Sequence, residues 1–153
     1  MLVTNLSEFA AAASGRRLIG LDLGTKTIGI ALSDAGHRIG TPMETIRRTK
    51  FTKDAQRLVE ICNEHDIGGI AIGLPLNMDG SEGPRVQATR AFERNLSEKI
   101  DLPMLFWDER LTTVAAERAM LEADLSRKKR AARIDATAAG LILQGVLDRL
   151  RAL

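Results

Sequence analysis

Two apolar segments joined by a short polar turn constrain this chain more than any other feature. Residues 18–21 are almost entirely aliphatic, and residues 28–32 place Ile, Ile and Leu at every second position. That alternation is typical of a β-strand. Residues 24–26, Gly-Thr-Lys, are a connection of the length that suits a hairpin. The sequence therefore predicts two antiparallel core strands.

Asp22 places a carboxylate in the first of these strands. A charged side chain inside a core strand costs several kcal/mol unless it is paired or binds a cation. One interpretation is a functional site to which other residues contribute. The other is an Asp that accepts hydrogen bonds from the turn amides of Gly24 and Thr25. This segment alone does not choose between them.

The remaining periodicities predict an α/β fold with a mixed sheet. Pro42 indicates that the third strand lies at the edge of the sheet. The expected elements after the hairpin are a strand at 40–46, a helix at 51–64, a strand at 69–73, a helix at 85–100, a strand at 103–107, a helix at 112–123 and a last helix at about 131–150.

Length and composition indicate one globular domain of 153 residues, 44% of them apolar. No apolar segment reaches the ~18 residues that a membrane span requires. Cys62 is the single cysteine, which excludes an internal disulfide and a thiolate metal cluster. We expect a cytoplasmic protein with a flexible N-terminal leader at residues 1–15 and a single domain at residues 16–153.

Basic residues are concentrated near the C-terminus. Between Arg127 and Arg151 the chain carries a net charge of +5, whereas the rest carries −3. Five of the basic residues fall within residues 127–133, which we expect to begin in a loop before the last helix. Such a cluster is typical of phosphate-binding surfaces, and a solvated loop is the alternative.

Acidic residues occur at three places that an α/β fold could bring together. Asp22 is on the first strand, Asp108 and Glu109 follow an apolar strand, and Asp135 is in the last helix. The carboxyl ends of strands in open α/β sheets commonly hold ligands. Clustered carboxylates favour Mg²⁺ or Mn²⁺. Alternatively, Asp135 pairs with a nearby arginine and Glu109 caps the next helix.

Four motifs occur in order along the chain. They are Asp-Leu-Gly-Thr-Lys-Thr-Ile-Gly-Ile-Ala at 22–31, Gly-Leu-Pro-Leu-Asn-Met-Asp-Gly at 73–80, Asp-Glu-Arg-Leu-Thr-Thr at 108–113, and a longer motif with Ser-Arg-Lys-Lys-Arg at 126–130, Asp-Ala-Thr-Ala-Ala at 135–139 and Leu-Ile-Leu-Gln at 141–144. Together they resemble the bacterial YqgF family of pre-16S rRNA nucleases, which is also described as a family of Holliday junction resolvases. The resemblance extends from residue 16 to about residue 150.

The resemblance implies a ribonuclease H-like fold, with a mixed five-stranded sheet flanked by helices. It implies that Asp22, Glu109 and Asp135 are the catalytic acids and the ligands of Mg²⁺ or Mn²⁺. The implied activity is metal-dependent phosphodiester hydrolysis at the 5′ end of pre-16S rRNA, with a two-metal mechanism. The alternative substrate is a four-way DNA junction, for which a homodimer is expected.

Other motif residues are candidates for contact with nucleic acid. We expect Lys26 to face a phosphate, Asn77 and Ser81 to hydrogen-bond the substrate, and Arg110 to hold Glu109 or neutralise charge. The four basic residues that open the C-terminal cluster are expected to grip phosphate; they are Arg127, Lys128, Lys129 and Arg130. The implied partners are an rRNA precursor or branched DNA, and a ribosomal particle, for a monomer or homodimer without membrane contact.

Two further classes of protein share some of these features. An Asp-Leu-Gly-Thr segment also begins the phosphate-binding domains of actin-like kinases and ATPases, but those proteins close two such domains around a nucleotide. A chain of 153 residues holds only one. A non-catalytic ribosome-assembly or transcription factor on the same fold is the other class, and it would tolerate the loss of Asp22 or Asp135.

Overall fold

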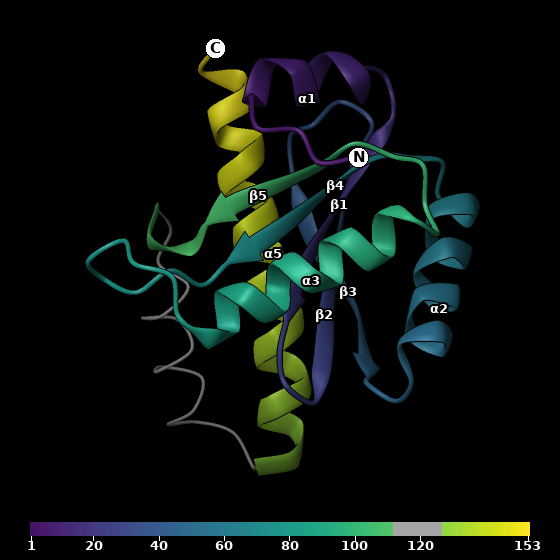
Figure 1. Cartoon of the computed structure of the whole chain (residues 1–153). Helices are drawn as coiled ribbons and strands as arrows, with labels where there is room; N and C mark the ends of the chain where they lie inside the picture. Colours follow the sequence, from purple (N-terminus) through teal and green to yellow (C-terminus); the bar gives the residue numbers. More distant parts are fainter. Residues whose placement is uncertain (112–126) are drawn as a thin grey trace.

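A computed structural model describes residues 1–111 and 127–153, with the side chains of residues 127–135 excepted (Figure 1). Five strands and four α-helices make up this part of the chain. In order they are α1 (Leu6–Ala12), β1 (Arg17–Leu23), β2 (Thr27–Ser33), β3 (Gly40–Arg47), α2 (Phe51–Glu64), β4 (Ile67–Leu74), α3 (Pro84–Ser97), β5 (Met104–Asp108), the 3₁₀ turn η1 (Glu109–Leu111) and α5 (Arg127–Arg151).

The strands form one mixed sheet in the order β3-β2-β1-β4-β5. Strands β1, β2 and β3 pair antiparallel, whereas β4 pairs parallel with both β1 and β5. The predicted hairpin and the mixed five-stranded sheet are therefore confirmed. Strand β3 lies at one edge, as Pro42 indicated.

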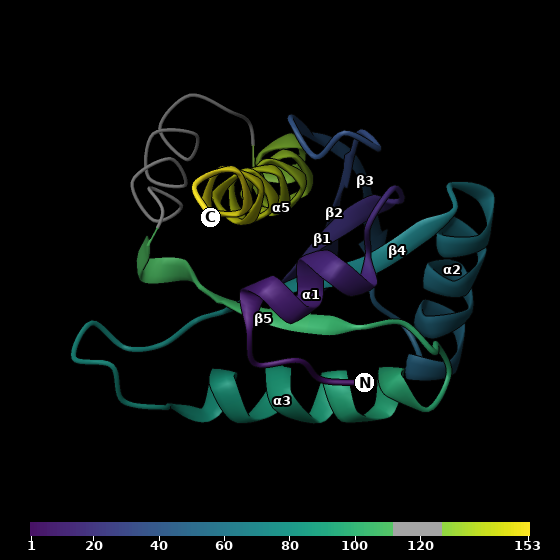
Figure 2. The same cartoon turned by 90° about the horizontal axis from the view of Figure 1, so that it is seen from above.

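Helices cover both faces of the sheet (Figure 2). Helices α2 and α3 lie on one face, and the long helix α5 and the short helix α1 lie on the other. Helix α5 contacts β1, β2, β3 and β4. Within the described residues, no helix is both long enough and apolar enough to cross a bilayer.

The two faces are filled by side chains of different size. Leu21, Ile30 and Ile72 belong to the buried cluster that packs against α2 and α3. On the α5 face, a Cβ atom on Gly20 would stand only 2.8 Å from Leu143 Cβ and 3.0 Å from the Ala139 carbonyl oxygen. Glycine at this position is what lets α5 approach the sheet so closely.

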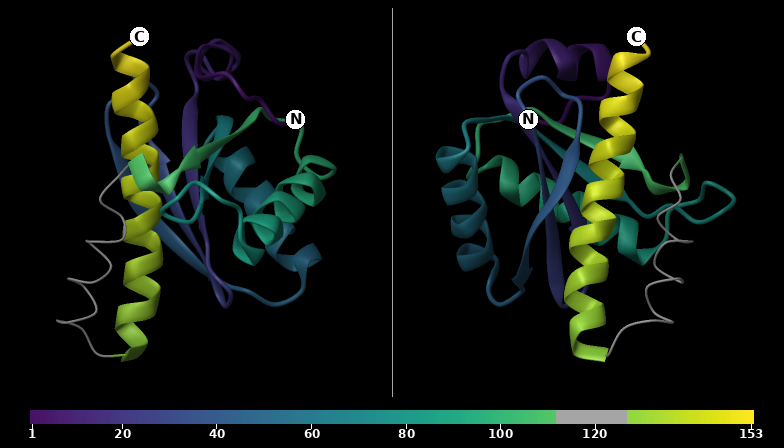
Figure 3. Two further views of the ribbon diagram at one scale, coloured as in Figure 1. Left: turned by 60° about the vertical axis from the view of Figure 1, so that its left-hand side comes forward. Right: turned by 180° about the vertical axis from the view of Figure 1, so that it is seen from behind.

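Residues 1–13 differ from the expected flexible leader, because they are packed against the domain. Asn5 caps α1 by accepting hydrogen bonds from the backbone amides of Ser7 and Glu8. Phe9 is fully buried over Gly69, where a Cβ atom would stand 2.9 Å from its ring. The Val3 amide donates to the Met104 carbonyl at 2.7 Å, so the first residues extend the sheet beyond β5. In Figure 3, α1 lies beside the C-terminal end of α5.

The last helix begins earlier than predicted. Residues 127–130, expected in a loop, form the first turn of α5. Arg, Lys and Ala are strong helix formers, so the basic cluster extends the helix once α5 is docked on the sheet. The helix predicted at 112–123 lies outside the described residues. The helix predicted at 85–100 is confirmed as α3, with its end at Ser97.

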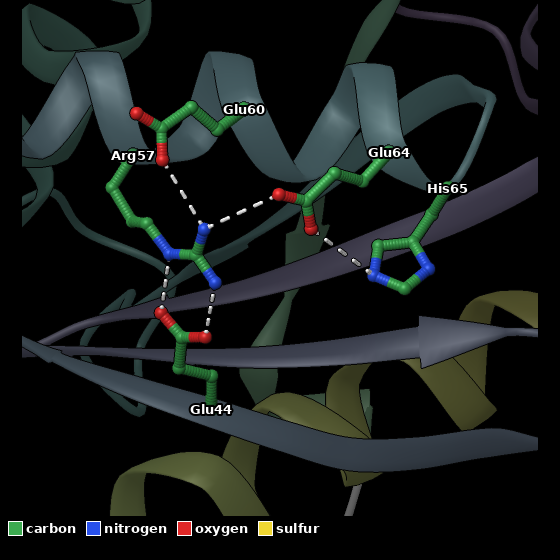
Figure 4. A network of polar contacts seen from close by, with 5 residues as sticks. All are labelled: Glu44, Arg57, Glu60, Glu64 and His65. Carbon is green, nitrogen blue, oxygen red and sulfur yellow. Dashed lines mark hydrogen bonds and ion pairs between the residues drawn. The ribbon is translucent and has the colours of Figure 1, made fainter.

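A polar network joins strand β3 to helix α2 (Figure 4). The Arg57 guanidinium donates two hydrogen bonds to the Glu44 carboxylate, at 2.7 and 2.9 Å. Its remaining amino group faces Glu60 at 3.2 Å and Glu64 at 3.8 Å. The Arg57 guanidinium lowers the pKa of Glu44. Arg57 is thus surrounded by carboxylates.

Candidate active site

Asp22 lies on the α5 face of β1, two residues after Gly20. Asp22 is only 4% exposed. On one side it pairs with Gly29 of β2. On the other side, the last register pair between β1 and β4 is Leu21 with Ile72, so the next position places Gly73 beside Asp22. Both strand neighbours of Asp22 are therefore glycines.

Glu109 approaches the same position from the end of β5. It begins η1, directly after the strand. A Cβ atom on Gly73 would stand 3.3 Å from both Cγ and Cδ of Glu109, so the Glu109 side chain lies over Gly73. The structure therefore brings Glu109 to the glycine that neighbours Asp22. Any side chain at Gly73 would enter space that Ile142 and Glu109 already occupy.

Helix α5 runs antiparallel to β1. Its residue Leu143 contacts Gly40 and its Gly140 contacts Pro42, which fixes its direction along β3 and, because β1 and β3 are parallel, along β1. Asp135 is one turn before Ala139, which is opposite Gly20. The helix backbone at Asp135 therefore lies further along β1, in the direction of Asp22. The Asp135 side chain is outside the described part, so its role as a ligand stays a prediction.

The described side chains include no cluster of three His, Cys, Asp or Glu residues of the kind that holds a metal ion. Asp22 and Glu109 supply two carboxylates, and Asp135 is the third ligand that the sequence predicts. Carboxylate oxygens fit Mg²⁺ or Mn²⁺ rather than softer metals. The donor chemistry of the two described acids thus fits the predicted ion.

Arg110 is bound to Asp108 rather than to Glu109. Its guanidinium donates to both Asp108 carboxylate oxygens at 2.8–3.1 Å. This contact lowers the pKa of Asp108. Arg110 also donates to the Met78 carbonyl oxygen at 3.3 Å. Asp108 and Arg110 therefore connect the end of β5 to the loop after β4, and they leave Glu109 to face Gly73.

The loop after β4 is held by bonds among its own side chains. Asn77 Nδ2 donates to Ser81 Oγ at 3.0 Å, and Ser81 Oγ donates to Asp79 Oδ1 at 2.6 Å. The hydrogen bonds from Ser81 lower the pKa of Asp79. Gly80 has a φ of +87°, and a Cβ atom there would stand 3.2 Å from Arg110 Nη1. The predicted contact of Asn77 and Ser81 with nucleic acid stays a prediction.

Basic groups surround the turn between β1 and β2. Lys26 is exposed at this turn, and its carbonyl oxygen accepts a hydrogen bond from the Arg48 amide at 2.8 Å. Arg48 and Arg85 donate to the carbonyl oxygens of Gly24 and Leu23 at 2.7 and 2.8 Å. Neither arginine stands in one of the four motifs, so the sequence alone did not point to them.

The sheet order, the flanking helices and the acid on the first strand define a ribonuclease H-like fold. Thermus thermophilus RuvC bound to a Holliday junction matches it with a TM-score of 0.55 at 12% identity, over 88% of this chain and 96% of RuvC. The yeast mitochondrial Holliday junction resolvase Ydc2 matches with a TM-score of 0.51 at 13% identity, over 96% and 86% of the two chains. At these identities the likeness concerns the fold.

Residues 16–149 match the family model described as "RuvX: Holliday junction resolvase". A Cereibacter sphaeroides protein is 64% identical over 98% of this chain and 94% of its own, and a Rhizobium etli protein is 60% identical over 98% and 92%. Both carry the name "Putative pre-16S rRNA nuclease". The chain belongs to the RuvX family, also called YqgF, which confirms the resemblance in its motifs.

Proposed function

We propose that this protein is a metal-dependent nuclease that hydrolyses phosphodiester bonds in structured nucleic acid. The observation that carries the proposal is the position of Glu109 over Gly73, the strand neighbour of buried Asp22. Asp22 and Glu109 come from different elements and flank the same glycine of β4. Family membership agrees with this chemistry.

Asp22, Glu109 and Asp135 would hold Mg²⁺ or Mn²⁺ in this proposal. When bound, a pair of such ions activates water and stabilises the charge on the leaving oxygen. Asp22 would keep its carboxylate fixed, because it stands on a central strand that is hydrogen-bonded on both sides. Arg110 would fix the main chain next to Glu109 through its bonds to Asp108. No histidine is required as a base.

The substrate that we favour is the 5′ end of pre-16S rRNA, which would place the protein in ribosome biogenesis in the cytoplasm. Support comes from the names of relatives that share 60–64% of their residues with this chain over nearly its whole length. A ribosomal particle carrying the precursor is then a natural partner. The oligomeric state is not constrained by this role.

The basic start of α5 would bind the substrate backbone. The first turn of this helix holds basic residues and no acidic ones. Positive side chains at a helix N-terminus oppose the helix dipole, whereas a phosphate placed there is favourable. We infer that Arg127, Lys128, Lys129 and Arg130 bind backbone phosphates of the nucleic acid. Lys26, Asn77, Ser81 and Arg110 remain candidates for further contacts.

The decisive experiment compares cut positions on a labelled pre-16S rRNA fragment and on a labelled four-way DNA junction, each with Mg²⁺ or Mn²⁺. We expect metal-dependent cuts near the mature 5′ end of the RNA, and none with Asp22→Asn. The absence of cutting on either substrate by the wild-type protein, with both metals, would overturn the proposal.

Cleavage of a DNA junction is the second candidate, which the description of the family model favours. A resolvase must cut two symmetric strands, and this requires a two-fold dimer. Symmetric cuts on the junction, together with a dimer in sedimentation, would select this role. Cuts on the RNA by a monomer would select rRNA processing.

A further inference from the structure

A surface cavity of about 180 Å³ lies beside the turn between β1 and β2. The turn forms one wall, and the first half of α3 forms the other. Its lining includes Thr25, Arg48, Arg85 and Phe92, and it contains no acidic residue.

The two arginines of this cavity are held by main-chain carbonyl groups and not by carboxylates. Arg57, Arg90 and Arg110 are each within 4.0 Å of a carboxylate. Among the described residues, Arg48 and Arg85 have no such neighbour, and they donate instead to the carbonyl oxygens of Gly24 and Leu23. These bonds orient the guanidinium groups without neutralising them.

Further contacts fix the cavity in shape and charge. The Arg48 guanidinium stacks 5.6 Å from the centre of the Phe92 ring, and Phe92 is itself packed edge-on against Phe51. Thr89 donates to the Arg85 carbonyl oxygen at 2.9 Å. Helix α3 begins at this wall with no side-chain cap and no acid in its first turn, so the positive end of its dipole adds to the two charges.

We propose that this cavity binds one backbone phosphate of the nucleic-acid substrate, a few nucleotides from the bond that is cut. The inference rests on the proposed nuclease function. Leu23 and Gly24, which hold the two guanidinium groups, directly follow Asp22 along the chain. A strand that crosses the turn can therefore reach the acids on the α5 face and the arginines on the α3 face. Paired arginines match the oxygens of a phosphate in geometry as well as charge.

The test measures binding of a labelled pre-16S rRNA fragment between 50 and 200 mM salt, with every variant carrying Asp22→Asn so that no cutting occurs. Arg48→Gln/Arg85→Gln should weaken binding about tenfold, as expected for the loss of one charge-assisted contact. It should also reduce the log–log salt slope by about 0.7, the value for one phosphate of a single strand. Arg94→Gln, an exposed change on the same α3 helix, should alter neither quantity.

A conservative pair separates binding from support of the turn. Arg48→Lys/Arg85→Lys keeps both charges and loses the paired geometry, so the salt slope should be retained while affinity falls. If Arg48→Gln/Arg85→Gln does not fold, the single variant Arg85→Gln takes its place and is compared with Arg48→Lys/Arg85→Lys. A slope and affinity equal to those of Arg94→Gln in folded variants would overturn the inference.

Free phosphate is the other source of the same chemistry. If it were the occupant, inorganic phosphate would raise the melting temperature only when both arginines are present, and RNA binding would not change in the Gln pair. That result would also overturn the inference. Cutting of RNA by the protein with Asp22 intact is measured separately, so a failure of this cavity proposal leaves the nuclease proposal standing. A wild-type protein that neither binds nor cuts would overturn both.

Discussion

The two faces of the central sheet serve different purposes in this molecule. The face under α2 and α3 is filled by large aliphatic side chains such as Leu21, Ile30 and Ile72. The face under α5 carries Gly20, Gly73 and the carboxylate of Asp22 at alternating or adjacent positions. Large apolar side chains contribute burial, whereas small ones contribute space. Stability and chemistry should therefore respond separately to substitutions on the two faces.

The largest effect is expected from Asp22→Asn on the α5 face. The amide keeps the shape of the side chain and removes the charge that would bind the cation. Cleavage should fall by a factor that corresponds to several kcal/mol in the barrier, on the order of a thousandfold or more. The measurement is the single-turnover rate on the labelled RNA fragment. Asp101→Asn, an exposed change before β5, is the matched control. A wild-type rate for Asp22→Asn would identify Asp22 as a turn-forming residue.

On the opposite face, Leu58→Ala should change stability and leave chemistry intact. Leu58 is fully buried in the cluster between α2 and the sheet. Its truncation should lower the free energy of unfolding by about 2–5 kcal/mol. Urea unfolding measures this loss, and cleavage per folded molecule at 25 °C should stay near the wild-type value. A cleavage defect larger than the unfolded fraction explains would contradict the separation of the two faces.

Gly73→Ala tests the small-residue face where stability and chemistry meet. The new Cβ atom would stand 2.5 Å from Ile142 Cδ1 and 3.3 Å from Glu109. We expect a loss of about 1–3 kcal/mol in stability from overpacking, and a clear loss of cleavage because Glu109 must shift. Adding Ile142→Val removes Cδ1 and should restore most of the stability. If Ile142→Val restores cleavage as fully as it restores stability, the cleavage loss in Gly73→Ala comes from overpacking and not from a shift of Glu109.

Local patterns in the sequence were sufficient to predict most of the sheet and its helices. The alternation in residues 28–32 and the helical spacing in residues 51–64 both depend on neighbours in the chain, and both are confirmed. The packed leader was not predictable in this way. Phe9 is buried because Gly69 leaves room for its ring, and Val3 is held by Met104, which is about a hundred residues away.

In the candidate site too, some features were predictable from local sequence and others depend on contacts between distant residues. The motifs identified Asp22 and Glu109, and the structure brings Glu109 to the strand neighbour of Asp22. The partner of Arg110 could not be predicted, since Asp108 and Glu109 both lie within two residues of it in the sequence, and only the structure shows the bond to Asp108. Arg48 and Arg85 are distant in sequence and meet only because the β1–β2 turn offers two successive carbonyl groups.

Substitutions at the start of α5 should have a smaller effect than substitutions in the candidate site. Lys128→Ala/Lys129→Ala removes two of the basic residues in its first turn. If each neutralises one phosphate of a single-stranded segment, the log–log salt slope should flatten by roughly 1.4. Turnover of bound RNA should change less, because the acids are untouched. Lys53→Ala/Lys99→Ala removes the same charge from exposed positions elsewhere. An unchanged slope in the α5 variant alone would indicate a solvated charge cluster.

The smallest effect is expected at the Glu44–Arg57 ion pair. It lies on the face covered by α2 and α3, where charge and not burial holds these two side chains together. Arg57→Gln should cost no more than about 1 kcal/mol at pH 7, because both side chains are partly exposed.

Arg57 lowers the pKa of Glu44 from its ordinary value of 4.5, so the folded state keeps this carboxylate charged to lower pH than the unfolded chain does. The stabilisation is therefore complete above about pH 4.5 and is lost as the pH falls through the lowered pKa. Urea unfolding of wild type and Arg57→Gln at pH 7 and at pH 3 should show a difference that shrinks at the acid pH. Glu44→Gln should reduce this dependence to the part that Glu60 and Glu64 supply. A difference of equal size at both pH values would mean that Arg57 stabilises α2 by packing its aliphatic stem, and the polar network would then contribute through burial like the rest of that face.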